Sequence, residues 1–551
     1  MISPQTQYKK MRYKIWAVAV CFCIALLVAW TKAGVLQIKK GRQLLELSTK
    51  QAMRKFEVSA LRGTIYDRHQ NVLASSVYLK SIYAEPNKIL DKKKVAKLLC
   101  QAIHKPLGFC EKKLFPKKGF IWVQRRVRPQ ISDAVKALDL EGIGFIDEEK
   151  RYYPNHFAMG HVLGSVSVDG EGIGGVEQAF HEVLEGNVDS KSILVDARGD
   201  RVHFYPYKNS EFEKGQDITL TLDLPIQHVV EDVLERSVKK HGARAAWAVL
   251  MDVRTGDLLS VANVPLINPN TPEKVPMFLR RNRAFSESFE PGSIFKLVTF
   301  AAALDKKLIS KNTLIDCENG EMQVGAFKVK DVSKQKVITA QDVLHFSSNV
   351  GIYKIADKLG KEGLHRAILN LGFGKKIGLG LVEEAPGRIS DYEKWGLARF
   401  VNVSFGYGIM VSSLQLLAMA ATIAREGVYV SPRILLNAPI QEPHRVLSQQ
   451  AALELGQMME VSTKEGNFGF RAHTGNIRAA GKSGTAEKVD EKTGKYNKRK
   501  NRSSFIGFAP LDKPRLALLV VVDEPQGIAY GGRVAAPAWG EIMTYALQAY
   551  E

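Results

Sequence analysis

An unbroken apolar run near the N-terminus constrains this chain more than any other feature. It begins at Ile15, stays apolar to Trp30 and, after a Thr-Lys pair, continues to Leu36. Counted to Leu36, the run has about the 20 residues that an α-helix needs to cross a bilayer. The sequence therefore predicts a membrane anchor over residues 15–36.

The charges before the run indicate its orientation. The first fourteen residues contain no acidic side chain and four basic ones: Lys9, Lys10, Arg12 and Lys14. Because basic residues favour the cytoplasmic side, residues 1–14 are predicted to be a cytoplasmic tail and the chain after Leu36 to lie outside. A cleaved signal peptide, cut near Thr31-Lys32-Ala33, is the alternative, but the run is longer than a typical signal core. No later segment is apolar enough to span, so we expect a single-pass protein.

The composition and the cysteines add weaker constraints. With 45% hydrophobic and 25% charged residues among 551, the rest of the chain is ordinary globular material. The net charge of +21 fits an acidic polymer, an anionic lipid or simply a basic surface. Cys100 and Cys110 either form a disulfide in an oxidising compartment or remain buried thiols, and the spacing leaves both open. Neither Cys nor His residues are clustered, so we expect no metal site and no cofactor.

After the anchor, the chain falls into two parts. Residues 37–215 are mixed, with short strand patterns broken by Gly and Pro, and nothing in them resembles a nucleophile with a base. We interpret this part as a pedestal, a spacer or docking domain. From residue 216 the pattern changes to an amphipathic helix over 225–241, a hairpin over 245–264 and late buried strands. Strands at both ends with helices between them predict an antiparallel sheet covered by helices, so residues 216–551 form an α/β domain.

The first candidate for chemistry is Ser293, with Lys296 three residues later. Pro291 and Gly292 precede an apolar helical run, which places Ser293 in the first turn of a helix. Residues three apart share a helix face, so the amine of Lys296 is expected within reach of the Ser293 hydroxyl. Burial disfavours the charged amine and gives a usable base. The pair is common by chance, so it is weak evidence by itself.

The second candidate is the triplet Ser347-Ser348-Asn349. A capping box at Thr339 predicts a short helix before it, and helical spacing resumes at Asn349. A polar break between two apolar helices presents a hydroxyl and an amide to a cleft. An ordinary turn explains the triplet equally well when it is taken alone.

The stretch from Thr474 to Lys500 offers three competing interpretations. A phosphate-binding loop is disfavoured, since Gly475 is one residue too far from Gly481-Lys482-Ser483 and no amphipathic helix follows. A literal Lys492-Thr493-Gly494 sits among charged residues and is typical of a hydrophilic hairpin tip. The third, Lys482-Ser483-Gly484-Thr485, follows an apolar segment and predicts an edge strand. There Lys482 points into a cleft and Gly484 lets a substrate approach closely.

The order S-x-x-K, S-x-N, K-[ST]-G is a strong joint signal. With it, the chain resembles the penicillin-binding proteins, serine acyl-transferases of the peptidoglycan wall. The segments RGTIYDR (62–68), RYYP (151–154) and GGVEQ (174–178) are similar to the N-terminal domain of class B members. The segment SFGYG (404–408) is most similar to the cell-division branch. Ser483 stands where many relatives have Thr, and the hydroxyl is kept.

The resemblance implies a D,D-transpeptidase in which Ser293 attacks the stem peptide's D-Ala-D-Ala bond and Lys296 takes its proton. It implies that Ser347 and Lys482 relay a proton to the leaving amine and that Lys482 also holds the substrate carboxylate. Asn349 then binds the donor backbone.

In the same resemblance, the backbone N–H groups of Ser293 and Thr485 form the oxyanion hole, and Ser483 and Gly484 line the substrate site.

The resemblance also implies partners and a location. We expect stem peptides and β-lactams as ligands, no nucleic acid, and a membrane-embedded glycan polymerase with other division proteins as partners. The catalytic domain is expected in the periplasm at the septum, anchored in the inner membrane. The alternatives are an elongation-type transpeptidase and a membrane-anchored β-lactam sensor or β-lactamase-like protein. A scaffold with a degenerate site is disfavoured because the motifs are intact.

Overall fold

The computed structural model describes residues 4–39, 53–116, 119–186, 188–195, 201–204, 214–461, 470–490 and 493–550. The chain forms two compact units, and it passes between them more than once. The smaller unit comprises Met1–Ala60, Tyr78–Lys150 and Asn187–Glu213, and the larger unit comprises Leu61–Val77, Arg151–Gly186 and Lys214–Glu551. The expected division after residue 215 stays a prediction.

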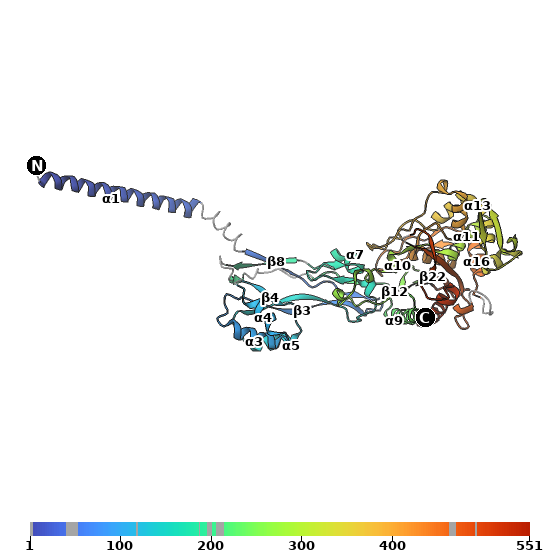
Figure 1. The fold of residues 1–551 in the computed structure, drawn as a ribbon, viewed down its shortest axis with the longest axis horizontal. Coiled ribbons are helices and arrows are strands. Elements are labelled where there is room, and N and C mark those ends of the chain that lie inside the picture. Colours follow the sequence, from blue (N-terminus) through green and yellow to red (C-terminus); the bar gives the residue numbers. More distant parts are fainter. Residues whose placement is uncertain are drawn as a thin grey trace. The chain divides into compact units, whose positions relative to one another are not determined.

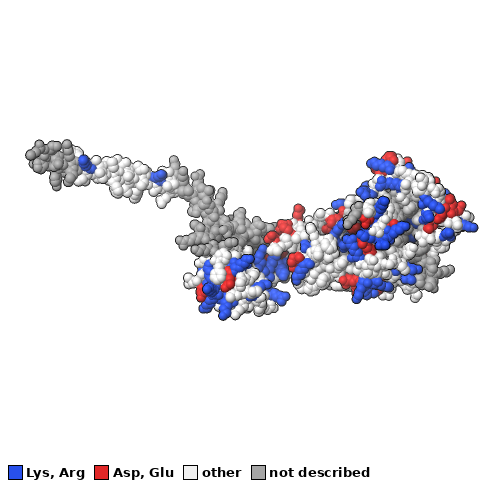
Figure 2. All heavy atoms as spheres, viewed as in Figure 1, with Lys and Arg blue, Asp and Glu red and all other residues white. Residues whose placement is uncertain are grey.

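Helix α1 (Pro4–Gly34) and the π-helical turn η1 (Val35–Lys39) contain the predicted anchor. The stretch Tyr13–Gln37 is long and apolar enough to cross a membrane, and no other described helix is. None of its apolar surface is buried within the protein. Figure 2 shows α1 almost without charge, with basic atoms near both ends of its described part. This is the length and composition that a membrane span requires.

The smaller unit combines two sets of strands with short helices (Figure 1). Strands β1 (Met53–Ser59), β8 (Val188–Val195) and β9 (Arg201–Phe204) form an antiparallel sheet in that order. The later residues of β3 (Val72–Ala84) pair with β4 (Ile121–Gln124) and with β5 (Ile143–Tyr152). The helices that contribute to its buried core are α3 (Lys92–Ala102), α4 (Leu107–Leu114) and α5 (Pro129–Ala137).

A disulfide between Cys100 and Cys110 joins α3 to α4. Cys100 lies on the buried face of α3, together with Val95 and Leu99. The two Cα atoms are 5.9 Å apart, which is within the span of a disulfide. The structure thus decides between the two states that the sequence left open, and a disulfide fits an oxidising compartment.

The larger unit is built on an antiparallel sheet with the order β12-β11-β23-β22-β21. The prediction of such a sheet is confirmed. The first hairpin pairs with strands from the end of the chain, so the sheet joins segments that are far apart in the sequence. Its strands are β11 (Ala245–Asp252), β12 (Leu258–Val264), β21 (Ala480–Val489), β22 (Tyr496–Ala509) and β23 (Leu516–Asp523).

Helices cover both faces of this sheet. Because successive side chains on a strand point to opposite faces, Ala246 and Ala248 face one buried cluster and Trp247 and Val249 the other. The first cluster includes α9 (Leu224–His241) and α17 (Gly531–Ala549). The second includes α11 (Lys296–Asp305), α13 (Asn349–Asn370), α14 (Leu397–Ser404), α15 (Ser413–Ala424) and α16 (Gln449–Met458).

Smaller elements complete the helical side of the larger unit. Helix α12 (Ala340–His345) precedes α13, and Thr339 caps it by accepting from the backbone N–H of Asp342. Short strands form further antiparallel pairs: β14 (Leu314–Asp316) with β17 (Val337–Thr339), and β15 (Glu321–Val324) with β16 (Phe327–Lys330).

Three segments of the N-terminal half meet at the buried carboxylate of Glu177. Arg62 and Arg151 each donate from Nε to one of its oxygens at 2.6 Å, and the Tyr153 hydroxyl donates at 3.2 Å. The Glu177 side chain is fully buried, and those of both arginines are 4% exposed. The three motifs similar to class B proteins therefore form a single ion cluster inside the larger unit.

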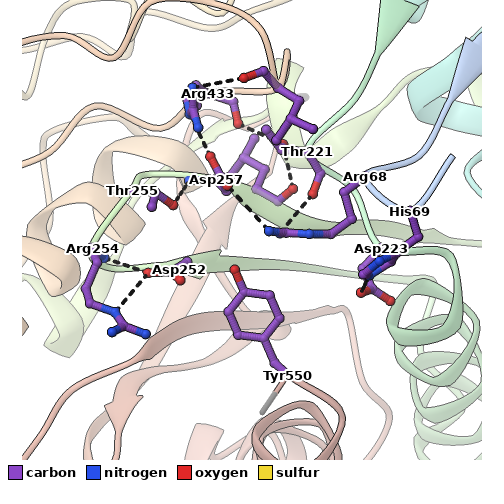
Figure 3. A network of polar contacts seen from close by, with 12 residues as sticks. Arg68, His69, Thr221, Asp223, Asp252, Arg254, Thr255, Asp257, Arg433 and Tyr550 are labelled. Atoms are coloured by element: carbon purple, nitrogen blue, oxygen red, sulfur yellow. Dashed lines mark hydrogen bonds and ion pairs between the residues drawn. The ribbon is translucent and has the colours of Figure 1, made fainter.

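The end of the same RGTIYDR segment is attached to the sheet of the larger unit (Figure 3). Arg68 forms an ion pair with Asp257 at 3.7 Å, and Asp257 accepts from Nε of Arg433 at 2.6 Å. The guanidinium of Arg68 also lies 5.0 Å from the ring centre of Tyr550, at the end of α17. The next residue, His69, contacts Asp223 at 2.9 Å. The segment is thus fixed against the hairpin β11–β12 and the C-terminal helix.

Candidate active site

Ser293 lies on a tight turn directly before helix α11. The turn is the 3₁₀-helix η4 (Gly292–Phe295), and α11 begins at Lys296. In a 3₁₀-helix, residues three apart eclipse each other, so this turn aligns Ser293 with Lys296 more closely than an α-helix does. Gly292 has a φ of +55°, and a Cβ there would lie 2.8 Å from the carbonyl oxygen of Thr485. Only glycine fits where the turn meets β21.

The amine of Lys296 is completely buried and holds the second motif in place. Its Nζ lies 2.5 Å from the carbonyl oxygen of Ser347, 3.0 Å from the Ser347 hydroxyl and 2.9 Å from Oδ1 of Asn349. Burial lowers the pKa of this amine well below its ordinary value, and the charge of Lys482 lowers it further. The opposing influence is the negative charge of Asp331. The result is an amine that loses its proton more readily than an ordinary lysine does.

Asp331 anchors the second motif and was not identified from the sequence. Its Oδ1 accepts from the backbone N–H groups of Asn349 and Val350, and its Oδ2 accepts from the Ser348 hydroxyl. A carboxylate at this position complements the positive end of α13. Ser347 has a φ of +56°, a left-handed conformation that is uncommon for a residue with a side chain. Asp331 therefore helps to hold a strained turn next to Lys296.

The third motif lies on β21, as predicted, next to Phe505 and Ile506 of β22. The strand's alternation separates its residues: Lys482 and Gly484 are buried, whereas Ser483 and Thr485 are half-buried. Burial lowers the pKa of Lys482 to about 8. Its Nζ lies 3.2 Å from the carbonyl oxygen of Ser483.

Gly484 is crowded by the protein itself. A Cβ there would lie 2.6 Å from Oγ of Ser504, 2.9 Å from Ile294 and 3.0 Å from the carbonyl oxygen of Pro291. The sequence suggested that Gly484 makes room for a substrate. The group that approaches it in the structure is instead the turn that carries Ser293.

A cavity of about 540 Å³ brings the three motifs together. Ser293 lines it, and so do Ser347, Asn349, Ser483 and Thr485. The hydroxyl of Thr485 accepts from the backbone N–H of Gly531, which fixes the start of α17 at the rim. Further lining side chains come from elsewhere: Val332, Phe346, Tyr407, Glu487, Asn501, Ile528 and Tyr530.

Glu290 is a second residue that the sequence did not single out. It accepts from the backbone N–H of Gly408 at 2.6 Å and from the Tyr496 hydroxyl at 2.9 Å, and burial raises its pKa. The ring of Tyr407 packs edge-on against that of Tyr496 at 5.5 Å. Three residues before Ser293, this carboxyl group thus ties the SFGYG segment and β22 to the Ser293 turn.

The structure excludes one rival interpretation of residues 474–500 and leaves the other untested. Gly481, Lys482 and Ser483 lie within a strand rather than in a loop that opens a helix, so they form no phosphate loop. Lys492 lies outside the described residues. Its neighbour Thr493 lies in the turn between β21 and β22, where its backbone N–H donates to Asp490.

Among the described residues, no group of three or more His, Cys, Asp and Glu side chains is arranged to hold a metal ion.

Comparison with known proteins identifies the family. Residues 246–544 match the penicillin binding protein transpeptidase domain, and residues 57–220 match the penicillin-binding protein dimerisation domain. The chain is 33% identical to the peptidoglycan D,D-transpeptidase FtsI of Escherichia coli over 551 residues, covering 98% of this chain and 93% of that protein. It is 30% identical to the probable peptidoglycan D,D-transpeptidase PbpC of Pseudomonas aeruginosa, covering 98% and 96%.

Solved structures of penicillin-binding proteins and a peptidoglycan synthetase share the fold of this chain. Penicillin binding protein 2X of Streptococcus thermophilus aligns with a TM-score of 0.76 at 24% identity, over 90% of this chain and 80% of that one. A peptidoglycan synthetase of Bifidobacterium adolescentis aligns with a TM-score of 0.68 at 25% identity, over 90% and 97%. With both domains matched and its relatives aligned over nearly their full length, the chain belongs to the class B penicillin-binding proteins.

Proposed function

We propose that the chain is a peptidoglycan D,D-transpeptidase that cross-links stem peptides during septal wall synthesis and is inhibited by β-lactams. The observation that carries the proposal is the single cavity on which the three motifs converge, lined by Ser293, Ser347, Asn349, Ser483 and Thr485. The similarity to proteins named peptidoglycan D,D-transpeptidase supports the same substrate class.

In the first half-reaction, Ser293 Oγ attacks the carbonyl carbon between the two terminal D-alanines. Lys296 accepts the Ser293 proton, and its lowered pKa favours this role because the amine loses its own proton more readily than an ordinary lysine does. Ser347 lies 3.0 Å from that amine and passes the proton on toward the leaving D-alanine. The products of this step are the acyl-enzyme and free D-alanine.

Substrate binding is assigned to the groups around that path. Lys482 and the Ser483 hydroxyl hold the terminal carboxylate, and the Asn349 amide binds the donor backbone. The backbone N–H groups of Ser293 and Thr485 stabilise the oxyanion, where losing one donor typically costs about 3–4 kcal/mol of transition-state stabilisation. In the second half-reaction, the amine of a neighbouring stem displaces Ser293 and forms the cross-link.

The apolar helix α1 and the basic residues before it support a proposed location. The N-terminus lies in the cytoplasm, the larger unit lies in the periplasm, and a membrane-embedded glycan polymerase with other division proteins recruits the enzyme to the septum. The SFGYG segment and the similarity to FtsI proteins support the division branch.

Two experiments test the proposal. The detergent-solubilised chain, incubated with a D-Ala-D-Ala stem pentapeptide and an amine acceptor, is expected to release D-alanine and form a cross-linked peptide detectable by mass spectrometry. No Ser293-dependent release would contradict the activity. Depleting the protein from growing cells is expected to give filaments with unpinched septa, whereas round or swollen cells would assign it to the elongation branch.

A further inference from the structure

A second cavity of about 540 Å³ lies at the other end of the same edge strand. It is lined by the residues that precede β21, from His473 to Ala479, and by Gln341 and His345 of α12. Met458 and Glu460 line it as well. None of the catalytic side chains assigned above lines it, so the proposed chemistry does not account for it.

A small space shares lining residues with both cavities. A gap of about 30 Å³ is lined by Lys482 and Ser483, and also by His345, Met458 and Glu460. Ser483 also lines the active-site cavity, and His345, Met458 and Glu460 also line the second cavity. The three spaces therefore follow one another along β21, and Lys482 lines the middle one.

The order of these spaces along β21 can be compared with the orientation of the bound substrate. In the proposed function, Lys482 and Ser483 hold the carboxylate of the departing D-alanine, so the leaving group lies on the Lys482 side of Ser293. The donor chain extends the other way, toward Tyr407 and Glu487 at the far end of the active-site cavity. An amine that replaces D-alanine must approach from the side that D-alanine leaves. That side opens toward the second cavity.

We propose that the second cavity is the binding subsite of the acceptor stem, the peptide whose amine resolves the acyl-enzyme. This inference rests on the proposed function and adds a separate site for the second substrate. The acceptor amine passes Lys482 and attacks the acyl carbon. The new C–N bond forms as the bond from that carbon to Ser293 Oγ breaks, and one proton moves from the nitrogen to Ser293 Oγ by way of Ser347 and Lys296, the reverse of the first half-reaction.

The lining suits a peptide that carries charges of both signs. His345 and His473 both line the cavity, and Arg478 contributes a guanidinium that is bonded to Glu460 at 2.8 and 3.1 Å. Asp342 adds a carboxylate from α12. An acceptor stem has carboxylates along its backbone and one reactive amine, so mixed polar walls fit it better than they fit an apolar ligand.

The test fills the cavity without changing the catalytic groups. Gln341→Trp and Asn476→Trp each introduce a large ring from an exposed lining position, one on α12 and one in the segment that precedes β21. The matched control is Gln450→Trp, in a cavity of about 440 Å³ elsewhere in the larger unit that shares no described lining residue with this series. Each full-length variant receives a peptide thioester donor and one of two acceptors. One acceptor is a stem tripeptide with a free side-chain amine. The other is hydroxylamine, which is small enough to need no subsite.

We expect penicillin acylation and transfer to hydroxylamine to stay within about 2-fold of wild type in all variants. Transfer to the tripeptide is expected to fall about 5-fold or more in the two cavity variants, with hydrolysis of the acyl-enzyme replacing it, and to stay unchanged in Gln450→Trp. Unchanged tripeptide transfer in both cavity variants overturns the inference, and so does an equal loss with both acceptors. Failure of the wild type to be acylated at all would instead overturn the proposed function.

Discussion

The amine of Lys296 lies 3.0 Å from the hydroxyl of Ser347, across a gap of fifty-one residues in the sequence. This contact joins the turn that carries Ser293 to the break between α12 and α13. The same amine lies 2.9 Å from Asn349, so one buried nitrogen organises two of the three motifs. The groups around this amine determine the pH at which it loses its proton, and each of them can be changed by mutation.

Asp331 is predicted to be a positioning residue. Asp331→Ala removes the acceptor of two α13 backbone N–H groups and of Ser348, so the Ser347 turn loosens and acylation by penicillin is expected to slow about 10-fold or more. The charge of Asp331 also raises the pKa of Lys296, so its removal lowers that pKa. The acid limb of the acylation rate profile is therefore expected to move to lower pH.

The control for this prediction is Asp91→Ala. Asp91 caps α3 in the smaller unit by accepting from Lys94 at 3.0 Å. Its loss is expected to cost about 1 kcal/mol of stability and to leave the acylation profile unchanged. If the acid limb of the Asp331→Ala rate profile stayed where it is in the wild type, Asp331 would act on stability alone.

The two lysine triplets make opposite predictions. Lys482→Ala is expected to reduce the rate of penicillin acylation about 100-fold or more, because it removes a buried cation next to Ser483 and close enough to influence Lys296. Lys492→Ala is expected to leave that rate within about 3-fold. Stopped-flow measurement of acylation compares them directly. The reverse ranking would move the third motif to the Lys492 triplet.

The Arg62–Glu177–Arg151 cluster is predicted to be essential for folding of the larger unit. Glu177→Gln leaves two buried guanidinium groups without a counter-charge, which typically costs about 3–5 kcal/mol. The matched control is Glu541→Gln, which removes an exposed ion pair with Arg236 and should cost about 1 kcal/mol or less. Thermal unfolding of both variants measures the difference, and equal small losses would contradict the importance of the cluster.

Glu231 is predicted to make stability depend on pH. Burial raises its pKa from 4.5 to about 7. Between these values, the unfolded chain loses the proton while the folded protein keeps it, so this residue reduces stability as pH rises, by about 3 kcal/mol once pH exceeds 7.

Glu231→Gln removes this dependence, since the amide keeps an oxygen that can accept from the Met159 backbone N–H and from Gln227. Measured by denaturant unfolding, the variant is expected to gain stability relative to wild type as pH rises from 4.5 to 7. A constant difference across that range would show that Glu231 ionises in the fold as it does in the unfolded chain.

Local signals in the sequence were sufficient for some features. The apolar run, the alternating strand patterns and the capping box at Thr339 each concern neighbouring residues, and the structure contains the helix, the antiparallel sheet and the cap. Placing Lys482 on a strand needed only the apolar residues before it.

Other features depend on contacts between distant residues, which one sequence does not reveal. Asp331 follows no local motif, and it becomes visible only where the chain folds back onto the start of α13. Gly484 was expected to face a substrate because nothing in the sequence places Pro291 and Ile294 against it. The meeting of Arg62, Arg151 and Glu177 likewise depends on three segments that are brought together only in the fold.

The central claim is that Ser293 is the nucleophile in a cavity assembled from three motifs. Its most direct test is to incubate the solubilised full-length chain with a labelled penicillin, digest it and locate the label by mass spectrometry. We predict one label per chain on the peptide that contains Ser293, and no label in Ser293→Ala, which keeps Lys296 and the rest of the cavity. Full labelling of Ser293→Ala, or a label on another residue of the wild type, would contradict the account.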